Sequence, residues 1–119
     1  MFSFSKKILK SLYPFSPFLS IRIAILRCCK YKIGKDVYIP SSFRVSDLKI
    51  RKNNLIIKDR VSIGPNVLVI TDSSSNNSRL KKIFPLVSKN VTIGKDVWIG
   101  AGVIIFPGIT IGECSIIGA

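Results

Sequence analysis

Aliphatic side chains recur in this chain at odd-numbered positions, with a period of six residues. Neighbouring members of the set are separated by even steps, mostly of two and four. That spacing places side chains on one face of extended backbone and does not follow the 3.6-residue period of a helix. The set, which we expect to face inward, comprises Ile33, Val37, Ile39, Phe43, Val45, Leu55, Ile57, Val61, Ile63, Val67, Val69, Val87, Val91, Ile93, Val97, Ile99, Val103, Ile105, Ile109, Ile111, Ser115 and Ile117. The sequence therefore predicts strands from residue 33 onward.

A simple hairpin meander would also turn the intervening odd-numbered residues inward, yet these include Lys35, Pro65 and Glu113, so the chain must bend there. Glycine often precedes the bend, as at Gly34 and Gly64, where the missing Cβ permits left-handed or crowded backbone. Six residues then form one short side and one corner, and three sides close a triangular coil. Stacked coils align equivalent residues about 4.8 Å apart. We predict an all-β solenoid, a parallel β-helix of hexapeptide repeats with about four coils.

The segment before the repeats predicts helices. Ser16 followed by Pro17 is typical of an N-cap and a first helical position, so we expect a helix from there to about Lys30, and a shorter one over residues 6–13. We therefore divide the chain into an N-terminal helical segment, 1–31, and a repeat domain, 32–119. Polar turn formers interrupt the hexads between Val69 and Val87, which predicts an excursion loop over about 72–86.

Two interpretations of the helical segment stand side by side. Solenoid ends need caps, so the helices are expected to cover the first coil. The segment also carries basic residues but no acid before Asp36, together with Phe15 and Phe18, a composition that suits contact with an anionic membrane surface. It has no uninterrupted apolar run of about 20 residues and no signal-peptide cleavage pattern, so we expect a cytoplasmic protein with the option of peripheral membrane contact.

The net charge of +13 is spread along the chain, without a helix-turn-helix, zinc-finger or aromatic RNA-binding signature. We therefore expect acidic partners, such as CoA phosphates or anionic lipid, and no nucleic acid. The chain has no histidine and three cysteines, of which Cys28 and Cys29 are adjacent. Neither a disulfide framework nor a metal site is expected.

The stretch VTIGKDVWIGAGVIIFPGITIGECSIIGA, residues 91–119, closely resembles the CoA-binding coils of hexapeptide-repeat O-acetyltransferases. These include the maltose and galactoside acetyltransferases and the sugar acetyltransferases of capsule and O-antigen synthesis. The resemblance covers residues 32–119. It implies a left-handed β-helix, a trimer with active sites between subunits, acetyl-CoA as acyl donor and a saccharide hydroxyl as acceptor.

The resemblance also assigns site residues. CoA contacts carry over to Trp98, Gly100, Ala101 and Ala119, and acceptor contacts carry over loosely to Ser42 or Arg44. Small residues at corners are, however, what the repeat needs in any case.

The general base of the family is a histidine at the start of the extended loop, and Asp72 stands at that position here. An ordinary aspartate has a pKa of about 3.9 and needs strong burial to act as a base near neutral pH. The other interpretation makes Asp72 a loop residue that hydrogen-bonds its own backbone. The sequence given also stops in mid-hexad, where relatives continue with a basic segment that holds CoA phosphates.

Two hypotheses remain open. One is a CoA-dependent O-acetyltransferase acting on a saccharide hydroxyl, with Asp72 or a residue of a partner chain as base. The other is a catalytically silent subunit that keeps assembly or binding, in a homotrimer or in a mixed trimer with a related chain.

Overall fold

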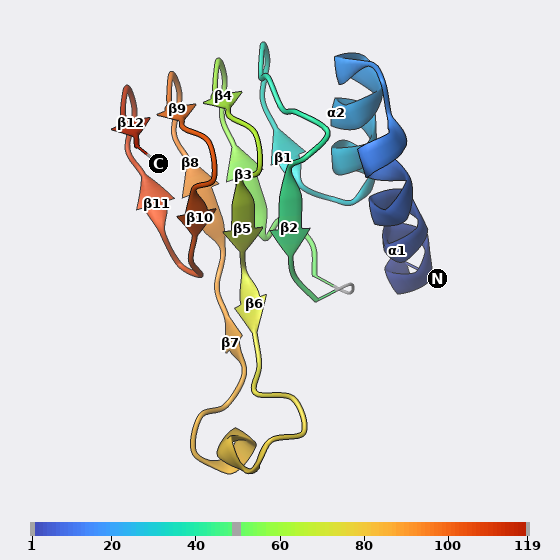
Figure 1. Cartoon of the computed structure of the whole chain (residues 1–119), viewed down its shortest axis with the longest axis vertical. Coiled ribbons are helices and arrows are strands. Elements are labelled where there is room, and N and C mark those ends of the chain that lie inside the picture. The colour runs from blue at the N-terminus through green and yellow to red at the C-terminus, as the bar shows by residue number, and fades with distance from the viewer. Residues whose placement is uncertain (1, 49–50, 119) are drawn as a thin grey trace.

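The computed structural model describes residues 2–48 and 51–118. Helices come first: α1 (Phe2–Leu12), the 3-10 helix η1 (Tyr13–Phe15) and α2 (Leu19–Cys28) precede a series of short strands (Figure 1). The strands of the coils are β1 (Lys32–Ile33), β2 (Arg44–Ser46), β3 (Leu55–Ile57), β4 (Ser62–Ile63), β5 (Leu68–Ile70), β8 (Val91–Ile93), β9 (Trp98–Ile99), β10 (Ile104–Ile105), β11 (Thr110–Ile111) and β12 (Ile116–Ile117).

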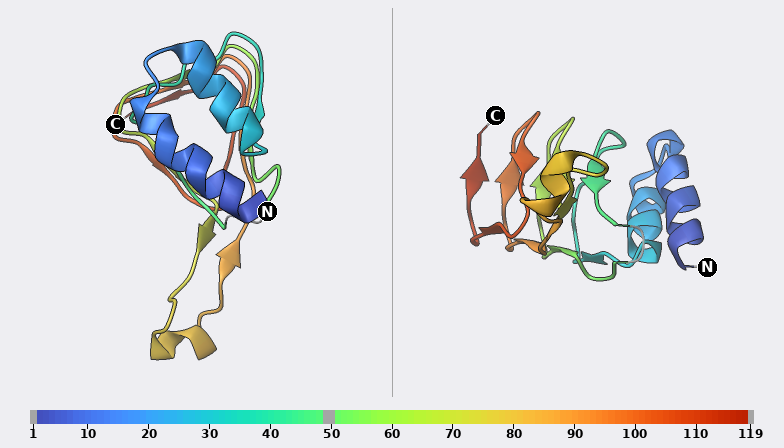
Figure 2. Two further views of the ribbon diagram at one scale, coloured as in Figure 1. Left: turned by 90° about the vertical axis from the view of Figure 1, so that its right-hand side faces the viewer. Right: turned by 90° about the horizontal axis from the view of Figure 1, so that it is seen from below.

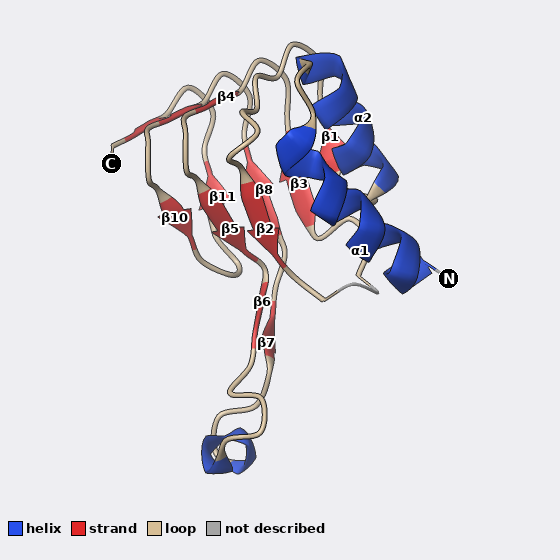
Figure 3. Cartoon of the chain, turned by 45° about the vertical axis from the view of Figure 1, so that its right-hand side comes forward, coloured by secondary structure: helices blue, strands red, loops and turns tan. Residues whose placement is uncertain are grey.

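The strands form three parallel sheets, which the chain visits in turn. One sheet has the order β1-β3-β8-β11, the second has β2-β5-β10 and the third has β4-β9-β12. A strand therefore pairs with the equivalent strand of the next turn of the chain, so that the turns stack as coils (Figure 3). The predicted parallel strands and helical N-terminus are confirmed.

Register explains why the odd-numbered series is apolar. Ile33 pairs with Ile57, Ile57 with Ile93, and Ile93 with Ile111, which places one aliphatic ladder along the first sheet. These side chains are buried, as are most members of the inward set. Nearest-neighbour stacking of this kind fills a narrow core that no single coil could bury alone.

Two members of the inward set are exposed, contrary to prediction. Val87 is 43% exposed because it lies in an antiparallel pair opposite Ser73, outside the coils. Ile109 is 45% exposed because it lies beside β11, which is an edge strand of its sheet. Among the described strands, β11 pairs with β8 alone.

At the corners, crowded backbone and left-handed backbone fall on different residues, although glycine was expected to serve both. A Cβ on Gly64 would lie 2.9 Å from the backbone N of Ala101, so glycine is required there by close coil packing. The left-handed conformation falls two residues later, on Asn66 with φ 57° and likewise on Asp96 with φ 57°. Asn and Asp tolerate this region better than most residues because their side chains hydrogen-bond locally.

The helices cover one end of the coil stack (Figure 2). Tyr13, Leu26 and Cys29 are buried in the same core cluster as Phe43 of the first coil. The predicted start of the second helix is wrong: α2 begins at residue 19 with Phe18 as its N-cap, because the N–H of Ser16 bonds Tyr13 and closes η1 instead.

A hairpin projects sideways from the stack (Figures 1 and 2). Its strands β6 (Asp72–Ser73) and β7 (Val87–Ser88) pair antiparallel, and the 3-10 helix η2 (Arg79–Lys82) lies near its tip. We call residues 72–88 the arm. The residues that flank the arm are also bonded: the N–H of Lys89 donates to the carbonyl of Thr71 at 2.9 Å, which holds the two ends of the arm together.

Candidate functional site

Asp72 is the first residue of the arm, and its side chain turns inward. Only 2% of the side chain is exposed. The carboxylate accepts the backbone N–H of Leu48 at 2.8 Å and the hydroxyl of Thr71 at 3.0 Å, both on Oδ2. The hydroxyl of Ser88 donates to Oδ1, and Arg51 Nε lies 3.6 Å from the same oxygen. Both oxygens are therefore engaged by this chain.

Thr71 connects Asp72 to a second buried carboxylate. The amide of Asn54 donates to Thr71 Oγ1 at 3.0 Å and to Asp47 Oδ2 at 2.8 Å. Thr71 and Asn54 are both fully buried. A polar chain thus runs from the root of the arm into the space between the first coil and α1.

Asp47 ties α1 to the coils. Its carboxylate accepts Lys10 Nζ at 2.6 Å, Lys6 Nζ at 2.7 Å and the hydroxyl of Tyr31 at 2.7 Å. The side chains of Asp47 and Lys6 are completely buried. A buried charge pair of this kind is costly unless its charges are hydrogen-bonded, and here Asp47 accepts from Lys6, Lys10, Tyr31 and Asn54.

The Asp47 cluster shifts the titration of its members. Burial works to raise the pKa of Asp47, but hydrogen bonds from Lys10, Lys6 and Asn54 outweigh it and hold the pKa below its ordinary value. Burial, reinforced by the neighbouring Asp47 carboxylate, raises the pKa of Tyr31. The cluster therefore keeps Asp47 ionised and Tyr31 protonated at neutral pH.

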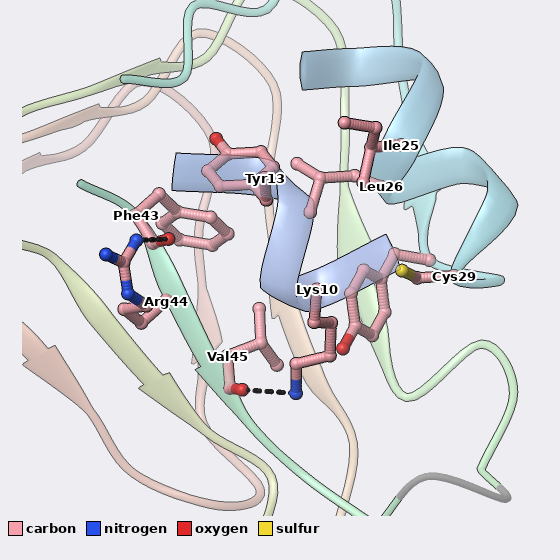
Figure 4. A pocket seen from close by; sticks show the side chains of 9 residues that line it. Lys10, Tyr13, Ile25, Leu26, Cys29, Phe43, Arg44 and Val45 are labelled. Carbon is pink, nitrogen blue, oxygen red and sulfur yellow. Dashed lines mark hydrogen bonds between the residues drawn. The ribbon is translucent and has the colours of Figure 1, made fainter. Parts of the chain in front are cut away.

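Close by, the helices and the first coil enclose a small apolar pocket (Figure 4). Tyr13, Leu26, Cys29 and Phe43 line it, and Lys10 crosses its edge to donate to the carbonyl of Val45 at 2.7 Å. Burial raises the pKa of the Cys29 thiol to about 11. The thiol is therefore neutral and behaves as a packing group.

Asp72 is poorly placed to act as a general base. A base must lie within hydrogen-bond reach of the substrate proton, whereas this carboxylate is buried and engaged by its own chain. Asp72 does contribute to the lining of an open hollow, together with Ser46, Asp47, Leu48, Ile70, Ser73, Ser74, Asn76 and Leu86. The contacts of Asp72 favour the interpretation that it fixes the root of the arm.

The residues with expected CoA contacts lie elsewhere on the coils. Trp98 points outward from β9, is 59% exposed and stands between Ser62 and Ile116 of the neighbouring coils. Gly100 donates its N–H to the carbonyl of Ile117 at 2.8 Å, so that donor already serves coil stacking. Ala101 is exposed at the corner, and Ala119 lies outside the described residues.

The expected acceptor residues lie on the first coil. The Ser42 hydroxyl accepts the N–H of Asn66 at 2.9 Å and so braces a corner. Arg44 is exposed in β2, and its Nη1 donates to the carbonyls of Ser41 and Phe43, both at 2.9 Å. Each therefore has a structural role of its own.

One chain does not bring the expected CoA and catalytic residues together. The corner at Ala101 packs beside Gly64, and the neighbouring Gly102 N–H bonds Pro65 at 2.9 Å. The chain then runs along one coil side from Pro65 to Asp72. With an extended rise of about 3.3 Å per residue, Asp72 lies on the order of 20 Å from Pro65 and from the Ala101 corner beside it.

The sequence did not predict four residues of this network: Asp47, Asn54, Arg51 and Ser88. One signal was available for Asp47: it continues the inward series after Phe43 and Val45 by one more step of two, as Thr71 continues the series after Val69. Polar residues in line with a buried ladder indicate a buried polar network. Arg51 and Ser88 contact Asp72 from distant parts of the chain, and no local pattern marks them.

No protein-family model matches the chain. The chain is 37% identical over 87 residues to the galactoside O-acetyltransferase of Escherichia coli (strain K12), an alignment that covers 73% of this chain and 41% of that protein. The chain thus spans about two fifths of the length of this curated relative.

Solved structures show the same architecture. A maltose O-acetyltransferase from Clostridium difficile 630 matches with a TM-score of 0.71 and 28% identity, over 99% of this chain and 73% of that one. A galactoside acetyltransferase in complex with coenzyme A matches with a TM-score of 0.68 over 98% of this chain and 68% of that one. Its identity of 24% supports the fold alone.

The hexad ladder and the stacked parallel strands define a hexapeptide-repeat protein. Together with these similarities, they show that the chain belongs to the hexapeptide-repeat acetyltransferase family.

Proposed function

We propose that this chain serves the acetyl-CoA-dependent O-acetylation of a saccharide hydroxyl, as a homotrimer of left-handed β-helices. The observation that carries the proposal is the 37% identity to a galactoside O-acetyltransferase over most of this chain. The structural match to a maltose O-acetyltransferase supports it. In this proposal residues 1–31 cap the repeat domain 32–119, and the arm is the excursion from it.

The outer surface at β9 fits the neutral part of CoA. Trp98 offers an exposed indole, Ile116 beside it is 72% exposed, and the exposed Ala101 continues the surface to the corner. An extended pantetheine arm has a comparable mixture of apolar and amide groups. Bound acetyl-CoA would supply an acetyl group activated as a thioester, while these residues would hold and orient it.

The proposed site lies between subunits. Because the expected CoA surface and the arm root are separated along a coil side, a neighbouring protomer must complete the site. Exposed apolar side chains on the outer sheet faces, including Trp98 at 59% and Ile104 at 51%, support association through these faces.

Asp72 positions the arm and is not proposed as the base. Ser42 and Arg44 remain the proposed acceptor contacts on the first coil. Without a histidine base, acetyl transfer by this chain alone is expected to be about 10²- to 10⁴-fold slower than in a relative that has one.

The alternative function is a silent assembly or binding subunit, in a trimer of its own or in a mixed trimer. The specific observation in its favour is the engagement of both Asp72 oxygens by Leu48, Thr71 and Ser88. For either function we propose a location at the cytoplasmic membrane surface, held peripherally. Within residues 2–48 and 51–118, no helix is long and apolar enough to cross a membrane.

The test uses the single tryptophan of the chain. Titration of the purified protein with acetyl-CoA should change the Trp98 fluorescence with saturation, and acetyl transfer to galactosides or maltose should be slow but measurable. Saturable binding without any transfer would favour the silent subunit. Absence of both binding and transfer would reject the acetyltransferase and leave only the assembly role.

A further inference from the structure

The helices expose apolar side chains at the end of the coil stack. The exposed fractions are 44% for Ile8, 53% for Leu12, 82% for Phe15, 64% for Phe18 and 44% for Ile21. We call these five residues the helix end face. Ile8 and Leu12 lie four residues apart on α1 and therefore share one side of that helix. Phe15 and Phe18 lie between α1 and α2, and Ile21 lies in the first turn of α2.

The helical segment packs Tyr13 and Leu26 on the core, but it also buries two cations while the five apolar side chains above stay exposed. Lys6 of α1 is fully buried against Asp47, and Arg22 of α2 is buried and donates to the carbonyls of Ile39 at 2.8 Å and Ser16 at 3.1 Å. An ordinary amphipathic helix would place such cations in water and its aromatics in the core. Five large apolar side chains exposed within residues 8–21 exceed the isolated exposed apolar residues of an ordinary surface, and such a concentration marks an interaction site.

The charge of the segment indicates what covers this face. The first acidic residue of the sequence is Asp36, whereas Lys7, Arg27 and Lys30 are exposed on or beside the helices. A second copy of the face would bring these cations against one another with no carboxylate to offset them. An anionic lipid surface offers acyl chains for the aromatics and headgroups for the cations at once.

We propose that the helix end face docks on an anionic lipid bilayer, with Phe15 and Phe18 inserted at the headgroup boundary. The inference rests on the peripheral location in the proposed function and names the residues responsible for it. The lysines of the cluster at Asp47 take no part, because they hold α1 to the coils.

The geometry of the molecule is compatible with this docking. The helices cover the end of the coil stack, while the arm projects sideways from it (Figure 2). A membrane against the end face therefore leaves the arm and the outer faces of the three sheets in water. In a cyclic trimer whose axis runs along the coils, the three end faces would point to the same side and bind together.

The experiment measures binding of the whole chain to vesicles by sedimentation, with phosphatidylcholine alone or mixed with phosphatidylglycerol. Wild type should bind the mixed vesicles, and salt should weaken the binding. The double variant Phe15→Ser/Phe18→Ser should bind at least about tenfold more weakly, given the cost of removing two aromatic side chains from lipid. Because both residues are exposed, its thermal unfolding should match wild type.

The matched control is Ile83→Ser/Phe84→Ser in the arm, where the replaced side chains are 70% and 63% exposed and basic residues are also close. This variant should bind like wild type. A reporter, Phe18→Trp in a Trp98→Phe background, should shift its emission to the blue on mixed vesicles.

Several outcomes would overturn the proposal: no binding to mixed vesicles, equal binding to phosphatidylcholine alone, or loss of binding in the arm variant only. Self-association of wild type that disappears in Phe15→Ser/Phe18→Ser would assign the face to a second copy instead. Since no acetyl-CoA or saccharide is present, the result is independent of whether the chain transfers acetyl groups.

Discussion

The hydroxyl of Ser88 donates a hydrogen bond to the carboxylate of Asp72, across the antiparallel pair that forms the root of the arm. The residue that the family resemblance aligns with the expected histidine is thus bound to the opposite strand of its own hairpin. We expect Ser88→Ala to destabilise the root by about 1 kcal/mol, the net value of such a bond. Faster amide exchange at Ser73 and Val87 would show it, while Ser62→Ala, exposed on β4, should leave exchange unchanged.

Asp72→Asn replaces the carboxylate by an amide that has one acceptor oxygen fewer. Because the N–H of Leu48, the hydroxyls of Thr71 and Ser88 and the guanidinium of Arg51 all face this group, we expect a loss of about 1–3 kcal/mol in unfolding free energy. Denaturant titration measures it. Measurable wild-type acetyl transfer that vanishes in a folded Asp72→Asn protein would contradict our assignment and make Asp72 the base.

Asp47 should make the attachment of α1 sensitive to acid. Its folded-state pKa is lowered, so its stabilising contribution is complete above the unfolded value of about 3.9 and is lost as pH falls through the folded value. We expect the melting temperature of wild type to drop below about pH 4. Asp47→Asn should be less stable at pH 7 by about 3 kcal/mol, since Lys6 and Lys10 lose their counter-charge.

The fall in melting temperature below about pH 4 should also be smaller in Asp47→Asn than in wild type. Should Asp47→Asn fail to fold, Lys10→Met removes one partner of Asp47 at a lysine that is itself 29% exposed, and should reduce the same acid dependence. If the melting temperatures of wild type and Lys10→Met fall equally with pH, the Asp47 cluster does not cause the acid dependence.

Trp98→Ala tests the proposed CoA surface. The side chain is largely exposed and contributes little to the core, so stability should change by less than about 0.5 kcal/mol. Affinity for CoA should fall by about tenfold, because the pantetheine arm loses its largest apolar contact. Calorimetric titration measures this, with Leu80→Ala in the arm, where the side chain is 51% exposed, as control.

Gly64→Ala tests coil packing. The added Cβ would meet the backbone of the next coil 2.9 Å away, and we expect a loss of about 1–3 kcal/mol from the forced shift. At Gly112 the nearest atom to an added Cβ is 3.9 Å away, so Gly112→Ala should be close to neutral in the same thermal melt.

The fold was predictable to the extent that it depends on local period. Even steps between aliphatics predicted the buried ladders, since each coil repeats the same contacts with its neighbours. The period does not predict contacts between distant segments, which is why Arg51 and Ser88 were missed around Asp72. The start of α2 was misplaced because Pro17 suits a first helical position, whereas η1 uses the preceding residues for a tighter turn.

The candidate site was predictable only through family resemblance. The resemblance predicted Asp72 as the residue at the histidine position, which stays a prediction, and the burial of Asp72 depends on contacts with Thr71 and Leu48, which lie on different coils. Likewise the basic N-terminal segment was recognised, while the inward direction of Lys6 and Lys10 depends on Asp47. Composition carries no information about which side of a helix a cation will face.

The bond between Lys89 and Thr71 has a consequence for how this molecule tolerates change. It closes the coil across the root of the arm, so the intervening residues add nothing to the register of the strands that follow. Insertions and deletions within the arm therefore leave the ladders aligned, whereas a single added residue inside a coil side would turn every later aliphatic outward. The root of the arm is thus a natural grafting point, where a foreign loop or a small domain can replace the tip.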